Sequence, residues 1–139
     1  MEIMTQPEFL ELCKSGQKVF EGRFMQFFDI SNITLEGITF KNCNMFICTF
    51  RNCSLKNVSF ENCDIYTGSF YAGDADNLAF EKCRLEMTIF DSFQFRNSCM
   101  RNCTIQWLGI LNSNAAGIDL STSSQFKVIT DISQVTPMI

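Results

Sequence analysis

Residues 41–65 read KNCNM FICTF RNCSL KNVSF ENCDI, a run in which every fifth residue is large and apolar. The same spacing, followed from Ile30 to Leu120, meets an apolar residue at all nineteen positions. Neither an α-helix, which repeats every 3.6 residues, nor a flat β-strand, which alternates every two, produces a strict period of five. The period therefore predicts a repeat architecture, and this has to be recognised before other features are interpreted.

A second inward position lies two residues before each large one, and in this stretch it holds mostly small residues: Cys43, Cys48, Cys53, Val58 and Cys63. A bulky Leu or Phe with a small residue two places earlier resembles the pentapeptide-repeat family, over about residues 30–125. The family often has Ala at the small site, where this chain prefers Cys. The resemblance implies an all-β fold, a right-handed quadrilateral β-helix or solenoid; a generic two-sheet β protein is the alternative.

A longer period of twenty residues lies on top of the short one. Units 41–45, 61–65, 81–85 and 101–105 read KNCNM, ENCDI, EKCRL and RNCTI. Four units then complete one coil, which predicts about five coils of 20 residues, stacked at about the 4.8 Å spacing of neighbouring strands. Side chains twenty residues apart should compensate each other in volume, as the large Phe93 would above the small Gly73. Opposite charges should alternate along one column, formed by Glu36, Lys56, Asp76 and Arg96.

The chain is expected to form a single domain over residues 1–139. Residues 1–16 are predicted to form a helical cap, with a helix from about Pro7 to Lys14 that begins after Thr5 and covers the first coil. Residues 17–40 form a lead-in coil, 41–125 the regular coils, and 126–139 a C-terminal cap or dimerisation tail. Between Phe20 and Ile30, strict phasing would bury Arg23, so we expect a one-residue bulge there.

Eight Cys occur without a single His. Six of the Cys fall at the small inward site, where Cys acts as a compact hydrophobe, so we expect core packing. Zinc binding and native disulfides are weaker alternatives, because zinc ligands lie closer in sequence and stacked Cys lie slightly too far apart. Cys99 should point outward. Asn recurs two places after the large residue, which favours corner turns over a polar ligand ladder.

Composition and motifs exclude several functions. A net charge of −4 argues against direct nucleic-acid binding, which needs a basic surface. An apolar run of membrane-spanning length and a secretory leader are both missing, so we expect a cytoplasmic protein without membrane contact. A nucleophile–base pair normally uses His, and a Gly-rich phosphate loop is not found. We therefore expect no enzyme activity, no metal and no cofactor.

One side of the predicted coil carries large apolar residues at its outward positions, which is typical of protein interfaces. The candidate contact face consists of Phe46, Ile47, Tyr66, Met87, Ile89 and Trp107. Our hypothesis is a non-catalytic protein-interaction or structural module. Its partner would be an unidentified protein, or a second copy bound through this face or the C-terminal tail. Packing of a terminal segment on this side is the other interpretation.

The resemblance also implies an alternative function, because some family members bind DNA gyrase as mimics of DNA. The resemblance implies that such members form longer rods, dimerise through a C-terminal element and have strongly acidic surfaces. This chain predicts a short rod in which the charges alternate in sign. A DNA mimic that binds gyrase or another topoisomerase is therefore the second hypothesis.

Overall fold

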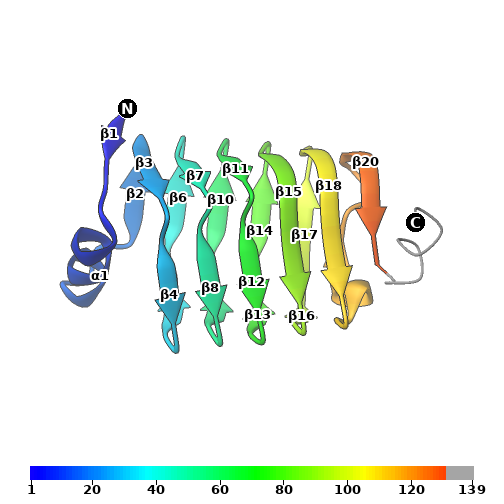
Figure 1. Cartoon of the computed structure of the whole chain (residues 1–139), viewed down its shortest axis with the longest axis horizontal. Helices are drawn as coiled ribbons and strands as arrows, with labels where there is room; N and C mark the ends of the chain where they lie inside the picture. Colours follow the sequence, from blue (N-terminus) through cyan, green and yellow to red (C-terminus); the bar gives the residue numbers. More distant parts are fainter. Residues whose placement is uncertain (131–139) are drawn as a thin grey trace.

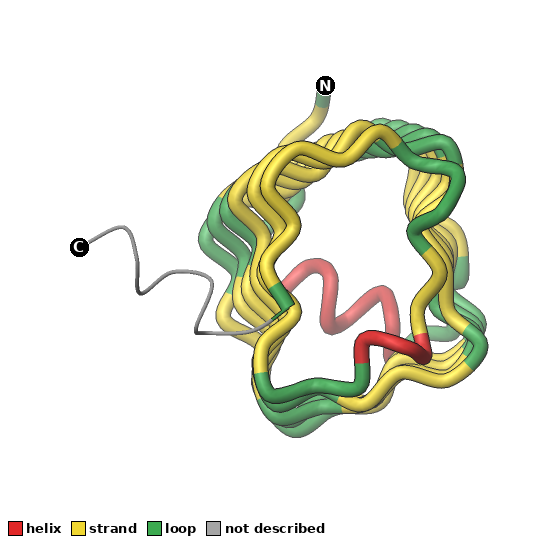
Figure 2. The backbone as a smooth tube through the Cα atoms, turned by 90° about the vertical axis from the view of Figure 1, so that its right-hand side faces the viewer, coloured by secondary structure: helices red, strands yellow, loops and turns green. Residues whose placement is uncertain are grey.

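The computed structural model describes residues 1–130, in which short parallel strands are stacked coil on coil into a four-sided rod (Figure 1, Figure 2). From Val19 onward, strands that lie twenty residues apart pair with each other; Phe60, for example, pairs with Phe40 and Phe80. The rod has about six turns. The β-solenoid and its twenty-residue coil are thus confirmed.

Four sides succeed one another in each coil, and we number them in chain order. Side one is a six-stranded sheet of β2 (Val19–Glu21), β6 (Thr39–Lys41), β10 (Ser59–Glu61), β14 (Ala79–Glu81), β17 (Ser98–Arg101) and β19 (Ile118–Asp119). Side four is a four-stranded sheet of β5 (Thr34–Glu36), β9 (Ser54–Lys56), β13 (Asp74–Asp76) and β16 (Gln94–Arg96), followed by the 3₁₀-helix η1 (Ala115–Gly117).

Sides two and three belong to one ten-stranded sheet. Side two contains β1 (Glu2–Ile3), β3 (Arg23–Gln26), β7 (Asn44–Phe46) and β11 (Asp64–Tyr66), and side three contains β4 (Asp29–Ser31), β8 (Thr49–Arg51) and β12 (Ser69–Tyr71). In the later coils one strand runs along both sides: β15 (Arg84–Asp91), β18 (Thr104–Leu111) and β20 (Ser124–Ile129). The corner between these two sides is therefore the one that continuous strands cross.

The core fills the bore of the rod with the large residue of each unit. On side one the rings of Phe40, Phe60 and Phe80 are stacked with centroids 4.7 and 4.8 Å apart. The predicted size compensation is also present, because a Cβ added to Gly73 would lie 2.7 Å from the ring of Phe93. Interiors at crystal-like density require such compensation between neighbouring coils.

From Gly22 to Asn112, the residue that turns each corner has a left-handed backbone, with positive φ. Asn adopts this conformation more readily than other L-residues with a Cβ. It turns nine of the corners, and its side chains bond along the rod; Asn52 Nδ2, for example, donates to Asn32 Oδ1 at 2.8 Å. The interpretation of the Asn residues as corner residues is confirmed.

Helix α1 (Gln6–Lys14) lies across the N-terminal end of the rod, where the first coil would otherwise expose its interior (Figure 2). The predicted start is confirmed, since the Thr5 hydroxyl accepts a hydrogen bond from the backbone N–H of Glu8 at 3.3 Å. Phe9 is buried, and its ring centroid lies 5.1 Å from that of Phe20. The helix thus covers the core at this end.

The predicted bulge between Phe20 and Ile30 is wrong. Phe20, Met25 and Ile30 are all buried in strict five-residue phase, and Arg23 occupies the small inward site. The site tolerates Arg because this end of the first coil is covered by β1 and α1 instead of a further coil. The guanidinium turns to the end of the rod and pairs with Glu8 at 2.9 Å, so its charge is compensated.

At the C-terminal end the coils continue beyond the predicted limit of residue 125, because β20 pairs with β18 as far as Ile129. Val128 packs against the core, whereas Phe126 is exposed. Residues 131–139 lie outside the described part, so the cap or dimerisation role of 126–139 stays a prediction. No helix within residues 1–130 is both long and apolar enough to span a membrane.

Candidate interaction surface

The corner between sides two and three is turned by residues unlike those of the other three corners. Its left-handed residues are Phe27, Ile47, Thr67, Met87, Trp107 and Lys127. The other corners use Asn at nine positions and otherwise Gly22, Gly37, Ala72, Lys82 and Ser92. At none of its six positions does this corner have Asn or Gly, the residues that best suit a left-handed backbone.

These corner residues and their neighbours form an exposed apolar strip. We call it the apolar corner and define it as Phe27, Phe46, Ile47, Tyr66, Met87, Ile89 and Trp107. It contains the six residues predicted from the sequence, placed along one corner of the rod, and their role in binding stays a prediction. Phe27 is an addition, and with 62% of its surface exposed it is the most exposed member.

On side two the apolar corner contains a short stack of aromatic rings. The rings of Phe46 and Tyr66 are nearly parallel with centroids 5.4 Å apart, and Phe27 meets Phe46 edge to face at 6.0 Å. Such contacts hold the rings in fixed positions along the rod. The strip therefore presents an ordered surface.

On side three the apolar corner borders a groove of about 330 Å³. Its lining includes the large residues Met87, Ile89 and Trp107 and the small residues Ser69 and Gly109. Gly109 lies between Ile89 and Ile129 in the same column, so the missing side chain leaves a hollow between two apolar ones. The groove is lined mainly by carbon and can receive apolar side chains of a partner.

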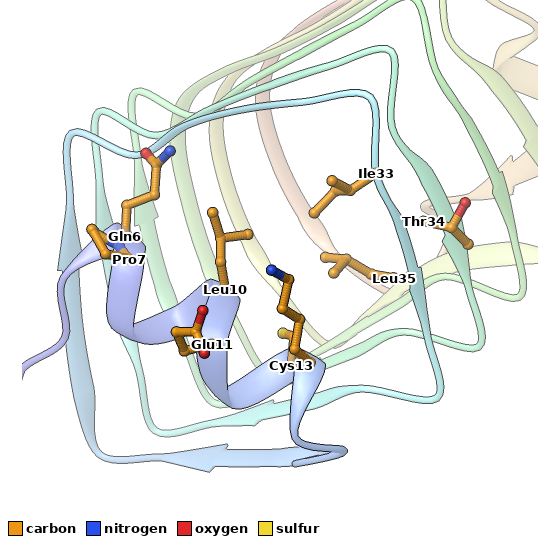
Figure 3. Close-up of a pocket in the computed structure, with 9 residues that line it drawn as sticks. Gln6, Pro7, Leu10, Glu11, Cys13, Ile33, Thr34 and Leu35 are labelled. Carbon is orange, nitrogen blue, oxygen red and sulfur yellow. The ribbon is translucent and has the colours of Figure 1, made fainter.

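A second pocket, of about 600 Å³, lies at the N-terminal end beside α1 (Figure 3). Helix α1 crosses only part of the mouth, and Leu10 on the helix and Ile33 and Leu35 on the opposite wall line the space left open. Glu11 and Lys14 place both charge signs at its rim. The pocket results from a helix narrower than the coil that it covers.

The six Cys at the small inward site are buried in the core, as predicted. Each thiol of one column donates to a backbone carbonyl of the preceding coil, as Cys63 does to Phe40 at 3.4 Å. Burial raises the pKa of Cys48 and Cys53, although nearby backbone N–H groups oppose the shift. The Cys48 and Cys53 thiols are therefore protonated packing groups, unsuited to act as nucleophiles. Cys99 is half-buried.

Several charged side chains lie beside opposite charges in neighbouring coils. Arg51 contacts Asp29 at 3.2 Å on side three, and Asp64 lies beside Arg84 in the ladder of side two. Glu61 and Glu81 on side one are an exception, since these like charges are neighbours. The column of alternating charges on side four has the predicted register. Among residues 1–130, no three Cys, Asp or Glu side chains are arranged to hold a metal ion.

Comparisons with known proteins give a structural likeness only. No protein-family model and no curated protein matches the sequence. The crystal structure of a pentapeptide repeat protein, Rfr23 from the cyanobacterium Cyanothece 51142, is similar to this structure with a TM-score of 0.50. The alignment includes 91% of this chain and 97% of the Rfr23 chain, with 11% sequence identity. Full-length QnrB1, a plasmid-mediated fluoroquinolone resistance protein, aligns with 99% of this chain over 92% of the QnrB1 chain. The sequence identity is 14% and the TM-score is 0.46. The register of twenty and the likeness to Rfr23 show that this chain has the pentapeptide-repeat fold.

Proposed function

We propose that the protein is a non-catalytic interaction module that binds a protein partner through the apolar corner. One observation carries the proposal: at this corner, large apolar residues occupy left-handed backbone while remaining exposed. Met87 has φ 52° and Trp107 has φ 62°, and they are 53% and 40% exposed.

Folding alone does not favour these residues. A left-handed backbone costs a residue with a Cβ about 1–2 kcal/mol, and the cost is lower for Asn. The β-branched Ile47 and Thr67 are among the least suited to it. Phe27, Met87 and Trp107 still leave 62%, 53% and 40% of their surface exposed, and a partner that covers this apolar area gives a reason to keep them, so selection for binding is the better explanation.

Two further observations support a non-catalytic role in the cytoplasm. The six core thiols are buried, and Lys41 pairs with Glu61 and Arg101 with Glu81 across neighbouring coils, each at 3.9 Å. All eight cysteines are free, which suits a reducing compartment.

Site-specific photo-crosslinking in cells of the source organism tests the proposal. A benzophenone amino acid replaces Met87, or Lys82 as the matched control. Lys82 is exposed, lies in the same coil and turns the corner between sides one and two with φ 53°. We expect a discrete protein adduct from position 87 that Trp107→Asn abolishes, and no such adduct from position 82.

The same adducts from both positions, or none from position 87, would refute the proposal. A fold defect would not be mistaken for this result. Asn is the residue that the other corners use, so Trp107→Asn retains the coil.

A further inference from the structure

We infer that the apolar corner binds a second copy of this chain, with the two rods side by side and antiparallel. This inference rests on the proposed function and names its partner. It depends on how residues of different size and charge are ordered along the corner.

A two-fold dimer places one strip against the same strip of another copy, so the strip must be complementary to itself. In the antiparallel arrangement the two-fold axis crosses the corner midway between Thr67 and Met87. Thr67 then meets Met87 of the second copy, and Ile47 meets Trp107. The smaller residue of each pair faces the larger one, and each pair occurs twice.

The groove on side three follows the same rule. Ser69 faces Ile89 of the second copy, and Thr49 faces Gly109. The Ile89 side chain of each copy can thus enter the groove of about 330 Å³ of the other, above the hollow that Ser69 leaves. On side two the Tyr66 hydroxyl meets the carboxylate of Glu86, which can accept its hydrogen bond.

The ends of the strip carry complementary groups. Phe27 and Asp29 lie at the N-terminal end of the corner, and Lys127 turns the same corner in the last coil. The antiparallel arrangement brings Lys127 to both groups of the second copy, giving a cation–π contact and an ion pair. Parallel rods would place Lys127 against Lys127 and Met87 against Met87. Charge therefore selects the antiparallel dimer.

The size of the strip predicts a weak dimer. Five steps between coils make the strip about 24 Å long. With both flanks in contact, each copy would bury about 500 Å² of accessible surface, or about 1,000 Å² for the two copies together. Interfaces of this size are at the lower limit for specific association. We expect a dissociation constant of about 1–100 μM and exchange between monomer and dimer.

Sedimentation velocity of the purified chain at 1 to about 300 μM tests this inference. We expect the wild type to shift from monomer to dimer, and Met87→Asn to stay monomeric throughout. Lys82→Asn, the control in the same coil, should dimerise like the wild type. Circular dichroism of both variants verifies the fold.

Charge reversal tests the orientation. Asp29→Lys and Lys127→Asp should each raise the dissociation constant about tenfold, and the double variant should restore it. A wild type that stays monomeric overturns the inference, as does dimerisation that Met87→Asn leaves unchanged. A double variant as weak as the single ones overturns the antiparallel arrangement. If the wild type is monomeric but position 87 crosslinks to a different protein in cells, the proposed function stands without the dimer. If position 87 gives no crosslinked product, both the dimer and the proposed function are refuted.

Discussion

Replacing Thr67 by Asn should stabilise the protein, although most substitutions destabilise. Thr67 has φ 55° in a corner where its branched Cβ is unfavourable. Its backbone N–H donates to the Glu86 carbonyl at 2.9 Å, and any residue except Pro retains this bond. Within residues 1–130, its side chain makes no hydrogen bond that the substitution removes.

The magnitude follows from the backbone. Relief of about half of the left-handed penalty raises the free energy of unfolding by about 0.5–1 kcal/mol. The neighbours of position 67 in the column are Ile47 and Met87, so the new amide has no Asn side chain beside it to bond and adds nothing further. For a domain of this size the gain raises Tm by about 2–5 °C.

The reciprocal substitution is Asn62→Thr on the corner between sides one and two. It imposes the same backbone penalty and removes the bond from Asn62 Nδ2 to Asn42 Oδ1, which measures 2.7 Å. Its free energy of unfolding should fall by about 2 kcal/mol. Urea unfolding followed by circular dichroism measures both variants against the wild type. If Thr67→Asn proves destabilising, the corner carries no such penalty, and the argument that binding maintains these residues is refuted.

Four other perturbations test separate parts of the structure. Gly73→Ala should lower the free energy of unfolding by about 3 kcal/mol in urea titrations, because the new Cβ clashes with the backbone carbonyl of Cys53 and meets the Phe93 ring at 2.7 Å; an unchanged midpoint would contradict this close packing. An aromatic disulfide reagent should modify Cys99 before the six core thiols, which should react only on unfolding. A hydrogen bond from Arg23 lowers the pKa of Glu8 below its ordinary value of 4.5, so stability should fall as the pH drops below that value. Glu8→Gln should weaken that pH dependence, and equal slopes would argue against the pair. Added protein at micromolar concentration should leave supercoiling by DNA gyrase unchanged, with and without quinolone, because the charges alternate in sign; inhibition or protection would instead support the DNA-mimic hypothesis.

The regular part of the fold could be predicted because a single rule repeats. Once Phe40 and Phe60 are assigned to one column, every other residue acquires a side and a neighbour. The core position of Cys63 and the compensation between Gly73 and Phe93 follow from that assignment.

The errors arise where the rule meets an end. A charged residue at the inward site of Arg23 is incompatible with a coil stacked between two others but acceptable in the first coil, where Glu8 of α1 pairs with it. A one-residue bulge there would shift the register of the residues that follow, so the contact face predicted from the sequence does not include Phe27. The sequence did contain a signal for that corner, since Ile47, Met87 and Trp107 stand where the other corners have Asn. The groove beside Gly109 could not be predicted, because its depth depends on side-chain positions in four coils.

The twenty-residue register determines which changes of length this protein can accept. Removing residues 61–80 would shorten the rod by one coil and leave every later residue on its original side, with the strands still in register. Removing only residues 61–65 would turn the rest of the rod by one side. Met87 and Trp107 would then follow Asn42 instead of Ile47, and the apolar corner would be divided between two corners. Insertions and deletions in this chain should therefore come in whole coils of twenty residues. Adding or removing a single five-residue unit keeps the five-residue pattern and the core, but it divides the surface that we propose for binding.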